Sequence, residues 1–275
     1  SKYYSNNEFD LYLEVAPYYY ISAWKHLSVE NETRYDANGQ NPITTLKYYK
    51  YDSETHKRMT SNSFKDSDGK TKGTDYTYPK DIVNTGTDDY SQAIGLMKQL
   101  NYNSPVIEKT SWVMNGSSKL ILDGQLNLHK KYTVEDDQGI LQNFVALSDV
   151  YHLEISPYLF ASSFDYITIN NQTLSFDNKF RKKIEILHRN KRGGITSLKD
   201  EKGLQVSYLW DLDDQQITAE VQNAGPEEIA SIHYEDSSDQ SWGTNGEATI
   251  WSNSGKLARK IPAATEDEYS WGPEI

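Results

Sequence analysis

Apolar and polar residues alternate along much of the chain. In residues 9–15, every second residue is apolar: Phe9, Leu11, Leu13 and Val15. This alternation is typical of a β-strand with one buried face. An aromatic-rich stretch follows at 17–24. We predict strands in both stretches. Apolar, β-branched and aromatic residues predict further strands at 43–49, 58–64, 106–113, 120–128, 151–155, 164–174, 183–188, 205–210 and 217–221.

Turn-forming residues separate these predicted strands. Asp36–Gly39, Asp66–Gly69 and Asn115-Gly116 are typical of hairpin turns, because Gly and Asn adopt positive φ at low cost. Short strands broken by such turns predict an all-β chain of meandering antiparallel hairpins, folded as a curved sheet, a sandwich or a barrel-like wall. Further turn signals occur at Asp123-Gly124, Gln138-Gly139, Asn170-Asn171, Gly193-Gly194 and Lys202-Gly203.

One segment has helical rather than strand spacing. Tyr90, Ala93, Ile94, Met97 and Leu100 recur at intervals of three and four residues. Two aspartates precede them, as suits a helix N-terminus, and Ser104-Pro105 provides a stop. The pattern predicts a single short helix near 89–100.

Composition supports the β assignment and limits the function classes. Only 36% of residues are hydrophobic, but there are 21 Tyr, whose rings pack while their hydroxyl groups stay hydrated. The net charge of -12 argues against a general nucleic-acid binder. The chain has no cysteine, so disulfides and thiolate sites are excluded. No apolar run is long enough for a membrane span.

A change of composition at 222–228 predicts a domain boundary. Residues 1–228 would form the main β domain, and 229–275 a Trp/Ser/Gly-rich tail or the start of a further β domain. A tail of this length is too short for a large core of its own. The chain has neither start nor stop features, so we expect a piece of a longer protein whose targeting signal lies elsewhere.

No catalytic, metal or cofactor motif is present. The six His are scattered, and no phosphate-binding loop or nucleophile elbow occurs. A calcium loop beginning at Asp66 would need a carboxylate at its twelfth position, which is Thr77. Asp211–Asp214 is interpreted as a solvated turn rather than a cation site. We therefore expect a protein that is not an enzyme, although a triad assembled from distant residues remains open.

Two surfaces are candidates for binding. The segment 179–192 is basic, and Arg181, Lys182 and Arg189 within it would meet an acidic partner, lipid headgroups or nucleic acid. The alternative is a strand whose positive charges block edge-to-edge pairing. In the tail, Trp242, Trp251 and Trp271 lie among Ser, Asn and Gly, as in sugar sites built from aromatic stacking. The alternative there is burial that anchors the tail.

Several phrases resemble a known family. Arg34–Ile43 and Lys50–Ser53 each contain Tyr-Asp before a turn, which resembles the YD repeat of Rhs proteins and teneurins. Longer phrases at 77–82 with 104–109, and at 206–211 with 217–224, are similar to those of large secreted or cell-surface bacterial YD-repeat proteins. The resemblance covers about 30–230.

The resemblance implies a fold and a role. Stacked hairpins in that family form a spiralling sheet closed as a hollow shell, which encloses a toxic C-terminal domain or serves adhesion and display. The repeats here are few and degenerate, so these residues alone would not build a complete shell. We expect a non-catalytic structural segment of an exported protein, secreted or on the cell surface, with type IX secretion as the implied route. Its partners would be neighbouring parts of a longer chain, secretion machinery or surface glycans. The alternative is a carbohydrate-binding or adhesion module that uses exposed aromatics.

Overall fold

The described part of the chain contains one large antiparallel sheet, two small two-stranded sheets and one α-helix. The computed structural model describes residues 24–135, 139–211, 214–229, 247–249 and 258–260. Within them a 12-stranded sheet has the order β1-β2-β3-β4-β5-β6-β7-β11-β12-β13-β14, and β8 pairs with β6. The predicted all-β class with one short helix is confirmed. The strands of this sheet are β1 (Val29–Arg34), β2 (Ile43–Lys50), β3 (Ser61–Lys65), β4 (Thr71–Thr77), β5 (Glu108–Asn115), β6 (Ser118–Glu135), β7 (Leu141–Leu153), β8 (Leu159–Phe160), β11 (Phe180–Arg189), β12 (Ile195–Asp200), β13 (Gln205–Trp210) and β14 (Ile217–Gln222).

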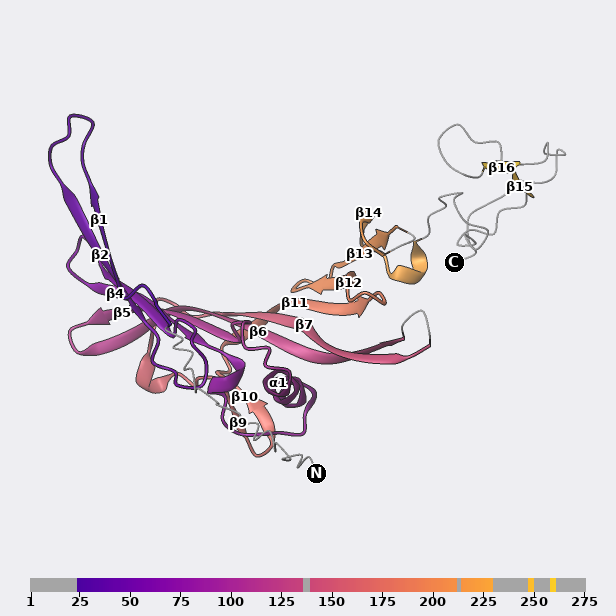
Figure 1. Ribbon diagram of the computed structural model, residues 1–275, viewed down its shortest axis with the longest axis horizontal. Helices are drawn as coiled ribbons and strands as arrows, with labels where there is room; N and C mark the ends of the chain where they lie inside the picture. Colours follow the sequence, from indigo (N-terminus) through magenta and orange to yellow (C-terminus); the bar gives the residue numbers. More distant parts are fainter. Residues whose placement is uncertain (1–23, 136–138, 212–213, 230–246, 250–257, 261–275) are drawn as a thin grey trace, which may run out of the picture.

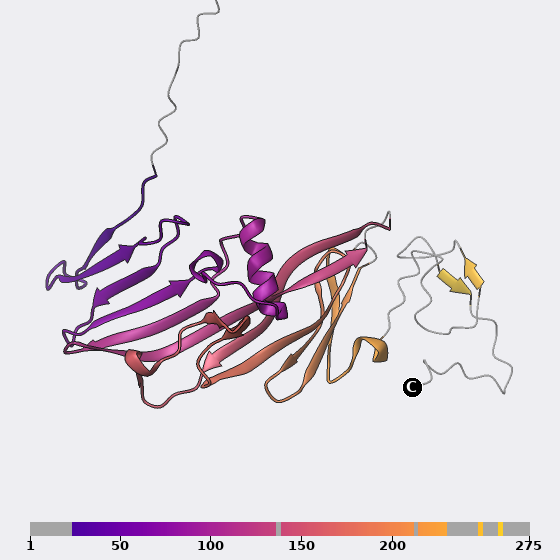
Figure 2. The same ribbon diagram turned by 90° about the horizontal axis from the view of Figure 1, so that it is seen from below.

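The sheet is bent into a trough. Figure 1 shows the β1–β2 arm rising at one end and β11–β14 rising at the other, on the same side of the sheet. The opposite, convex side carries the helix α1 (Asp89–Gln99) and the small hairpin of β9 (Thr168–Asn170) and β10 (Thr173–Ser175). Seen from below in Figure 2, α1 lies across the middle of the sheet. The remaining elements are η1 (Pro79–Asp81), η2 (Ala161–Ser163), η3 (Pro226–Glu228) and the β15 (Glu247–Thr249)–β16 (Ala258–Lys260) pair.

The hairpins share one kind of turn. In 36–40 and 66–70 the first residue is Asp and the fourth is Gly, and the Gly N–H donates to the carbonyl of that Asp. Gly39 and Gly69 have φ of +73° and +80°, a left-handed conformation that strains residues with a Cβ. The same pattern, with Asn or Asp first, closes 190–194 and 200–204. The predicted turns at these positions are confirmed.

The helix begins and ends where its sequence predicts. Asp88 caps the N-terminus by accepting hydrogen bonds from the N–H groups of Tyr90 and Ser91, which would otherwise lack partners. Ala93, Ile94 and Met97 are buried against the sheet. Because these side chains lie on one stripe of α1, the helix covers the convex face and closes the core there.

The core lies between the convex face and the elements that cover it. Ile121, Leu126 and Leu128 of β6 have almost no exposed surface, and they pack with α1 and with the loop after β7. The other members of the cluster are Ile82, Ile94, Met97, Ile107, Leu153, Phe164, Ile167, Ile169, Leu174 and Phe180. The core is thus made by layers on one side of the sheet only.

Some sequence predictions were wrong. Asp123-Gly124 is not a turn, because both residues lie within β6, where Gly124 pairs with Thr110. A Cβ on Gly124 would come within 3.1 Å of Phe180 and 3.2 Å of Leu153, so close packing explains this glycine. The predicted strand at 164–174 is not continuous: it begins as an irregular loop and ends in the β9–β10 hairpin, whose turn follows the predicted signal at Asn170-Asn171.

Other expectations differ in extent or lie beyond the structure. The sequence interpretation missed β1, β4 and β12, and most of the length of the β6–β7 hairpin. The stretches 9–15 and 17–23 lie outside the described residues, and Trp24 is not in a strand. The predicted boundary at 222–228 follows the last strand of the large sheet and contains η3. Most of 229–275 also lies outside the described residues.

Candidate functional site

The open feature of the molecule is the concave face of the sheet, opposite α1. Strand register aligns two rows of polar side chains across this face, and every member is partly or fully exposed. The side chains differ in chemistry but all offer hydrogen-bonding groups. The rows are Tyr49–Asn62–Thr74–Ser111–Asp123 and Tyr76–Lys109–Gln125–His152–Arg181. The Asn62 amide joins them by donating to the Tyr76 hydroxyl at 3.1 Å.

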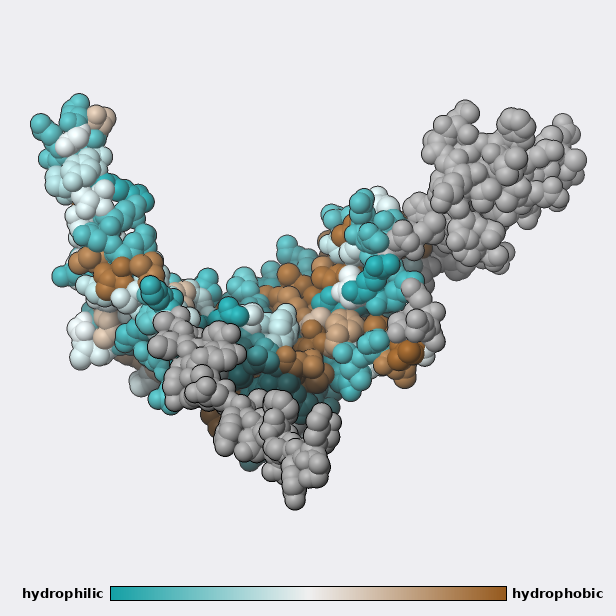
Figure 3. Space-filling view, in the orientation of Figure 1, coloured by the Kyte–Doolittle hydropathy of each residue, from teal (hydrophilic) through white to brown (hydrophobic). Residues whose placement is uncertain are grey.

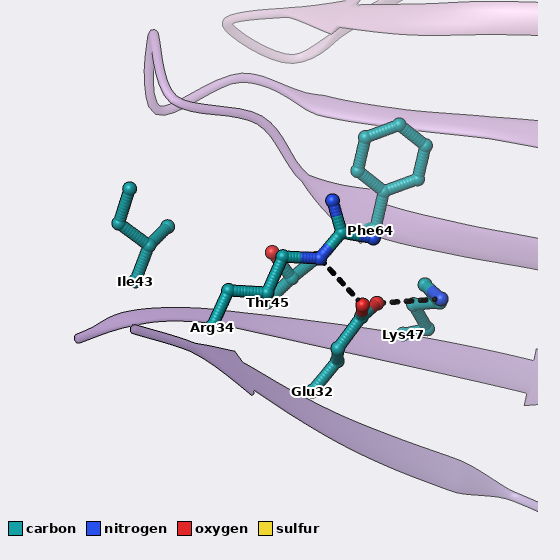
Figure 4. Close-up of a pocket in the computed structure, with 6 residues that line it drawn as sticks. All are labelled: Glu32, Arg34, Ile43, Thr45, Lys47 and Phe64. Atoms are coloured by element: carbon teal, nitrogen blue, oxygen red, sulfur yellow. Dashed lines mark hydrogen bonds and ion pairs between the residues drawn. The ribbon is translucent and has the colours of Figure 1, made fainter. Parts of the chain in front are cut away.

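The concave face is hollowed near its N-terminal end. Six residues of β1, β2 and β3 line an open hollow of about 360 Å³ (Figure 4). Strand alternation places all of them on the concave side, with Phe64 beside the charged groups. The lining residues are Glu32, Arg34, Ile43, Thr45, Lys47 and Phe64.

Charges in this hollow are paired with one another. Glu32 lies between two cations: its Oε1 is 2.6 Å from Arg34 Nε and its Oε2 is 3.2 Å from Lys47 Nζ. These hydrogen bonds hold the pKa of the Glu32 carboxyl below its ordinary value, and the bond from Arg34 has the largest effect. The Tyr49 hydroxyl donates to Glu30 at 2.5 Å and lowers the pKa of that carboxyl too. Hydrogen bonds to Glu32 raise the pKa of Lys47.

This arrangement suits binding rather than catalysis. Both carboxyl groups stay ionised at neutral pH, and neither has the raised pKa that a general acid needs. Among the described residues, no group of three or more His, Asp or Glu could hold a metal ion. The hollow offers polar contacts and one aromatic ring, so its chemistry fits a polar ligand.

The structure separates the predicted basic residues. Arg181 is on the concave face, where its guanidinium donates to the carbonyl of Asn178 at 2.6 Å. Lys182 is on the convex face, 2.7 Å from Asp149 and 3.3 Å from Glu185. Alternation along β11 therefore points neighbouring charges to opposite sides.

Arg189 is bound within the protein too. Its guanidinium donates to the carbonyls of Gly193, at 2.6 Å, and Leu147, and it lies over the Tyr132 ring at 5.2 Å. The three residues do not form one basic surface. The alternative interpretation as edge protection was also wrong, because β11 pairs with β7 and with β12 and is not an edge.

The aromatic candidates of the tail are not placed by the structure. Trp242, Trp251 and Trp271 lie outside the described residues. Of the other tryptophans, Trp112 donates to Asp75 at 2.8 Å and Trp210 to the carbonyl of Ile195 at 2.9 Å. Trp24 is 46% exposed and stacks on His26, so it is the described tryptophan best placed to contact a ligand.

A buried ionic cluster joins α1 to the sheet, and the sequence interpretation missed it. Asp149 is fully buried and accepts hydrogen bonds from the Tyr90 hydroxyl at 2.8 Å and the Ser148 hydroxyl at 2.6 Å. Burial favours its neutral form, but hydrogen bonds from Lys182, Ser148 and Tyr90 outweigh burial and lower the pKa of the carboxyl. The only sequence signal was an acidic residue inside an apolar stretch of a strand.

Glu108 is a second buried carboxyl group that the sequence interpretation missed. It is 1% exposed, and its Oε2 accepts a hydrogen bond from the Ile167 N–H at 3.3 Å. Its Oε1 is buried without a hydrogen-bond partner. Burial, with smaller contributions from Asp177 and Asp75, raises the pKa of Glu108 to about 7, although the hydrogen bond from Ile167 acts in the opposite direction.

Comparison with known proteins leaves the family open. No protein-family model matches the chain, and no curated protein matches it. In the described part of the chain, no helix has the length and apolar character needed to cross a membrane.

Proposed function

We propose that this chain is a non-catalytic wall segment of an exported YD-repeat protein, secreted or displayed on the cell surface. The observation that carries the proposal is the unbroken order of the sheet, in which β1 to β7 and β11 to β14 each pair with the next strand in sequence. Such a meander grows by adding hairpins, as stacked repeats do. The resemblance of the Tyr-Asp phrases supplies the family.

The recurring turn supports the same role. In three of the four five-residue turns the first side chain also caps the turn: Asp36, Asn190 and Asp200 each accept the N–H groups two and four residues ahead. In the fourth turn, Asp66 accepts the N–H of Ser67 instead. In the Tyr-Asp phrase at 35–36, the Asp is thus a turn-closing residue rather than an active-site acid. Repetition of one local device is typical of a structural array.

The two faces of the sheet also suit a wall. The middle of the convex face is covered by α1 and the loop after β7 (Figure 1), whereas the two polar rows of the concave face are partly or fully exposed. Figure 3 shows hydrophobic patches along the trough beside polar ones. Polar rows of this kind can stay hydrated and line a cavity, although apolar residues such as Phe64 and Ile184 share the face. A cavity enclosed by such a wall would hold a toxic domain or other cargo.

Cryo-electron microscopy of the native protein that carries this chain tests the proposal. We expect the sheet to continue beyond β1 or β14 into further hairpins, with the concave face turned towards a cavity. If both strands end at solvent and the concave face packs on a separate domain, the wall proposal is wrong.

Glycan binding is a second candidate, and the hollow at Phe64 favours it. An aromatic ring beside Thr45 and the charged groups of Figure 4 can stack on a sugar while polar groups bind its hydroxyls. We expect Phe64→Ala to abolish binding on a glycan array, and Phe160→Ala, on the exposed β8 strand, to leave it unchanged. An array without binding by the unmodified chain would exclude this candidate.

A further inference from the structure

The loop that joins β7 to β11, residues 154–179, covers the convex face beside α1. It contributes Phe164, Ile167, Ile169 and Leu174 to the core. Polar contacts hold its β9–β10 hairpin to the α1 side: the Leu174 N–H donates to Asp88, and the Asn84 amide donates to the carbonyl of Ile169. The middle of the loop has its contact with β5 through Glu108.

Glu108 is an unusual choice for this position. Its register neighbours on the same face are Thr77 of β4 and Leu126 of β6, and the loop lies over it. Only one of its two carboxyl oxygens has a hydrogen-bond partner, the Ile167 N–H. The bond from the Ile167 N–H favours the ionised carboxylate, but burial with a single donor disfavours the charge more strongly.

The charges around Glu108 oppose its ionisation. Asp75 of β4 and Asp177 at the end of the loop both act on it electrostatically. The nearby cations are taken: Lys119 of β6 pairs with Asp75, and Lys179 lies 3.4 Å from Asp177. Burial raises the pKa of Tyr166 to about 12, so its hydroxyl stays neutral through the physiological range.

We propose that Glu108 is a proton-operated latch: its neutral carboxyl group keeps the middle of the loop, around Ile167, closed on the sheet, and its ionisation releases that part while β8 and the β9–β10 hairpin stay attached. Releasing the loop lets water reach the charged oxygen, which relieves the burial of an unpartnered charge. It also uncovers the apolar side chains of the loop and of β6. The device therefore switches part of the convex face from sealed to open.

The raised pKa of Glu108 sets the direction in which the stability of the closed state changes with pH. An unfolded glutamate loses its proton near 4.5, whereas burial in the folded chain keeps the proton bound up to about 7. A raised carboxyl pKa gives stability that is fully present below pH 4.5 and is lost as the pH rises to about 7. The closed state therefore weakens as the pH rises from about 4.5 to about 7 and weakens no further above that.

Hydrogen–deuterium exchange of the whole chain, followed by mass spectrometry from pH 5.5 to 8.5, tests the latch. After correction for the intrinsic pH dependence of exchange, we expect protection of residues 164–170 to fall by roughly 30-fold over this range, mostly below about pH 7, and then to level off. Peptides of β12–β14 should keep their protection. An unmodified protein with no such step in 164–170 lacks the latch.

Two variants separate the latch from general loosening. Glu108→Gln keeps an acceptor for the Ile167 N–H and has no proton to lose, so its protection should not depend on pH. Glu154→Gln alters an exposed carboxylate at the start of the loop, 2.7 Å from Lys183, and should keep the step. A step that survives in Glu108→Gln overturns the proposal.

If Glu108→Gln does not fold, a direct titration of Glu108 in the unmodified chain tests the latch instead. Carbon-13 NMR of the side-chain carboxyl groups reports the pKa of Glu108 in the unmodified chain. A pKa close to the pH of the exchange step supports the latch, and a pKa near the ordinary 4.5 overturns it.

Discussion

The β1–β2 arm and the centre of the sheet are built from the same hairpins but are stabilised differently. No residue of β1 or β2 is buried, whereas β6 has Ile121, Leu126 and Leu128 in the core. The arm has strand pairing, exposed ion pairs and a capped turn. The centre adds a second layer, made by α1 and the 154–179 loop. The turn and the strand pattern allow a hairpin to form, but the elements that pack on it make it stable.

Removing a core side chain should show the largest difference. Leu126→Ala leaves a cavity at a fully buried site, so we expect a loss of about 2–5 kcal/mol in the free energy of unfolding. Leu46→Ala in the arm, where Leu46 is 39% exposed, should change it by about 0.5 kcal/mol or less. Denaturant unfolding followed by circular dichroism measures both. Equal losses would mean that the arm has a cover in solution.

Breaking the buried ionic cluster should have a smaller effect. Asp149→Asn removes the charge that faces Lys182, 2.7 Å away, and weakens the bond from the Tyr90 hydroxyl. Hydrogen bonds to charged groups contribute about 1.5–3 kcal/mol, and we expect a destabilisation in that range. The matched change in the arm, Glu32→Gln, affects exposed ion pairs and should cost about 1 kcal/mol or less. If Asp149→Asn leaves the free energy of unfolding unchanged, Lys182 has another partner in the variant, and Glu185 is the nearest candidate.

The smallest effects should come from glycines with no close neighbour. A Cβ at Gly39 meets nothing within 4 Å, but φ is +73°, so Gly39→Ala should cost about 1–2 kcal/mol. Because the arm is separate from the core, the loss should appear as faster hydrogen exchange of β1–β2 rather than as a lower overall stability. Gly95→Ala, in α1 with open space around it, should instead stabilise the chain by about 0.5–1 kcal/mol.

The features that could be predicted are the local ones. Asp66–Gly69 closes its turn with its own backbone and side chains, and α1 carries both its cap and its apolar stripe in consecutive residues. The period of two located β2, β13 and β14 for the same reason. Each of these signals is written within about ten residues of sequence, where single-sequence reasoning is strongest.

The features that were missed depend on distant residues. Gly124 looks like a turn until Phe180 and Leu153 are placed over it. Asp149 needs Lys182 and Tyr90 to be satisfied, and Glu108 meets Ile167, which lies 59 residues away. The basic segment was judged by its charge alone, because no local pattern shows that Asp149 would face Lys182. The concave rows likewise exist only through strand register.

The order of the large sheet has a consequence for how the chain comes apart under tension. A pull on the C-terminal side reaches β14 first, then β13 and β12, each held only by its neighbours in the sequence. These strands separate one at a time, and no segment has to be pulled out from under another. Resistance rises at β7 and β6, where α1 and the 154–179 loop clamp the sheet. The strand order therefore predicts stepwise unfolding from the C-terminal end, with the force rising where α1 and the 154–179 loop cover the sheet.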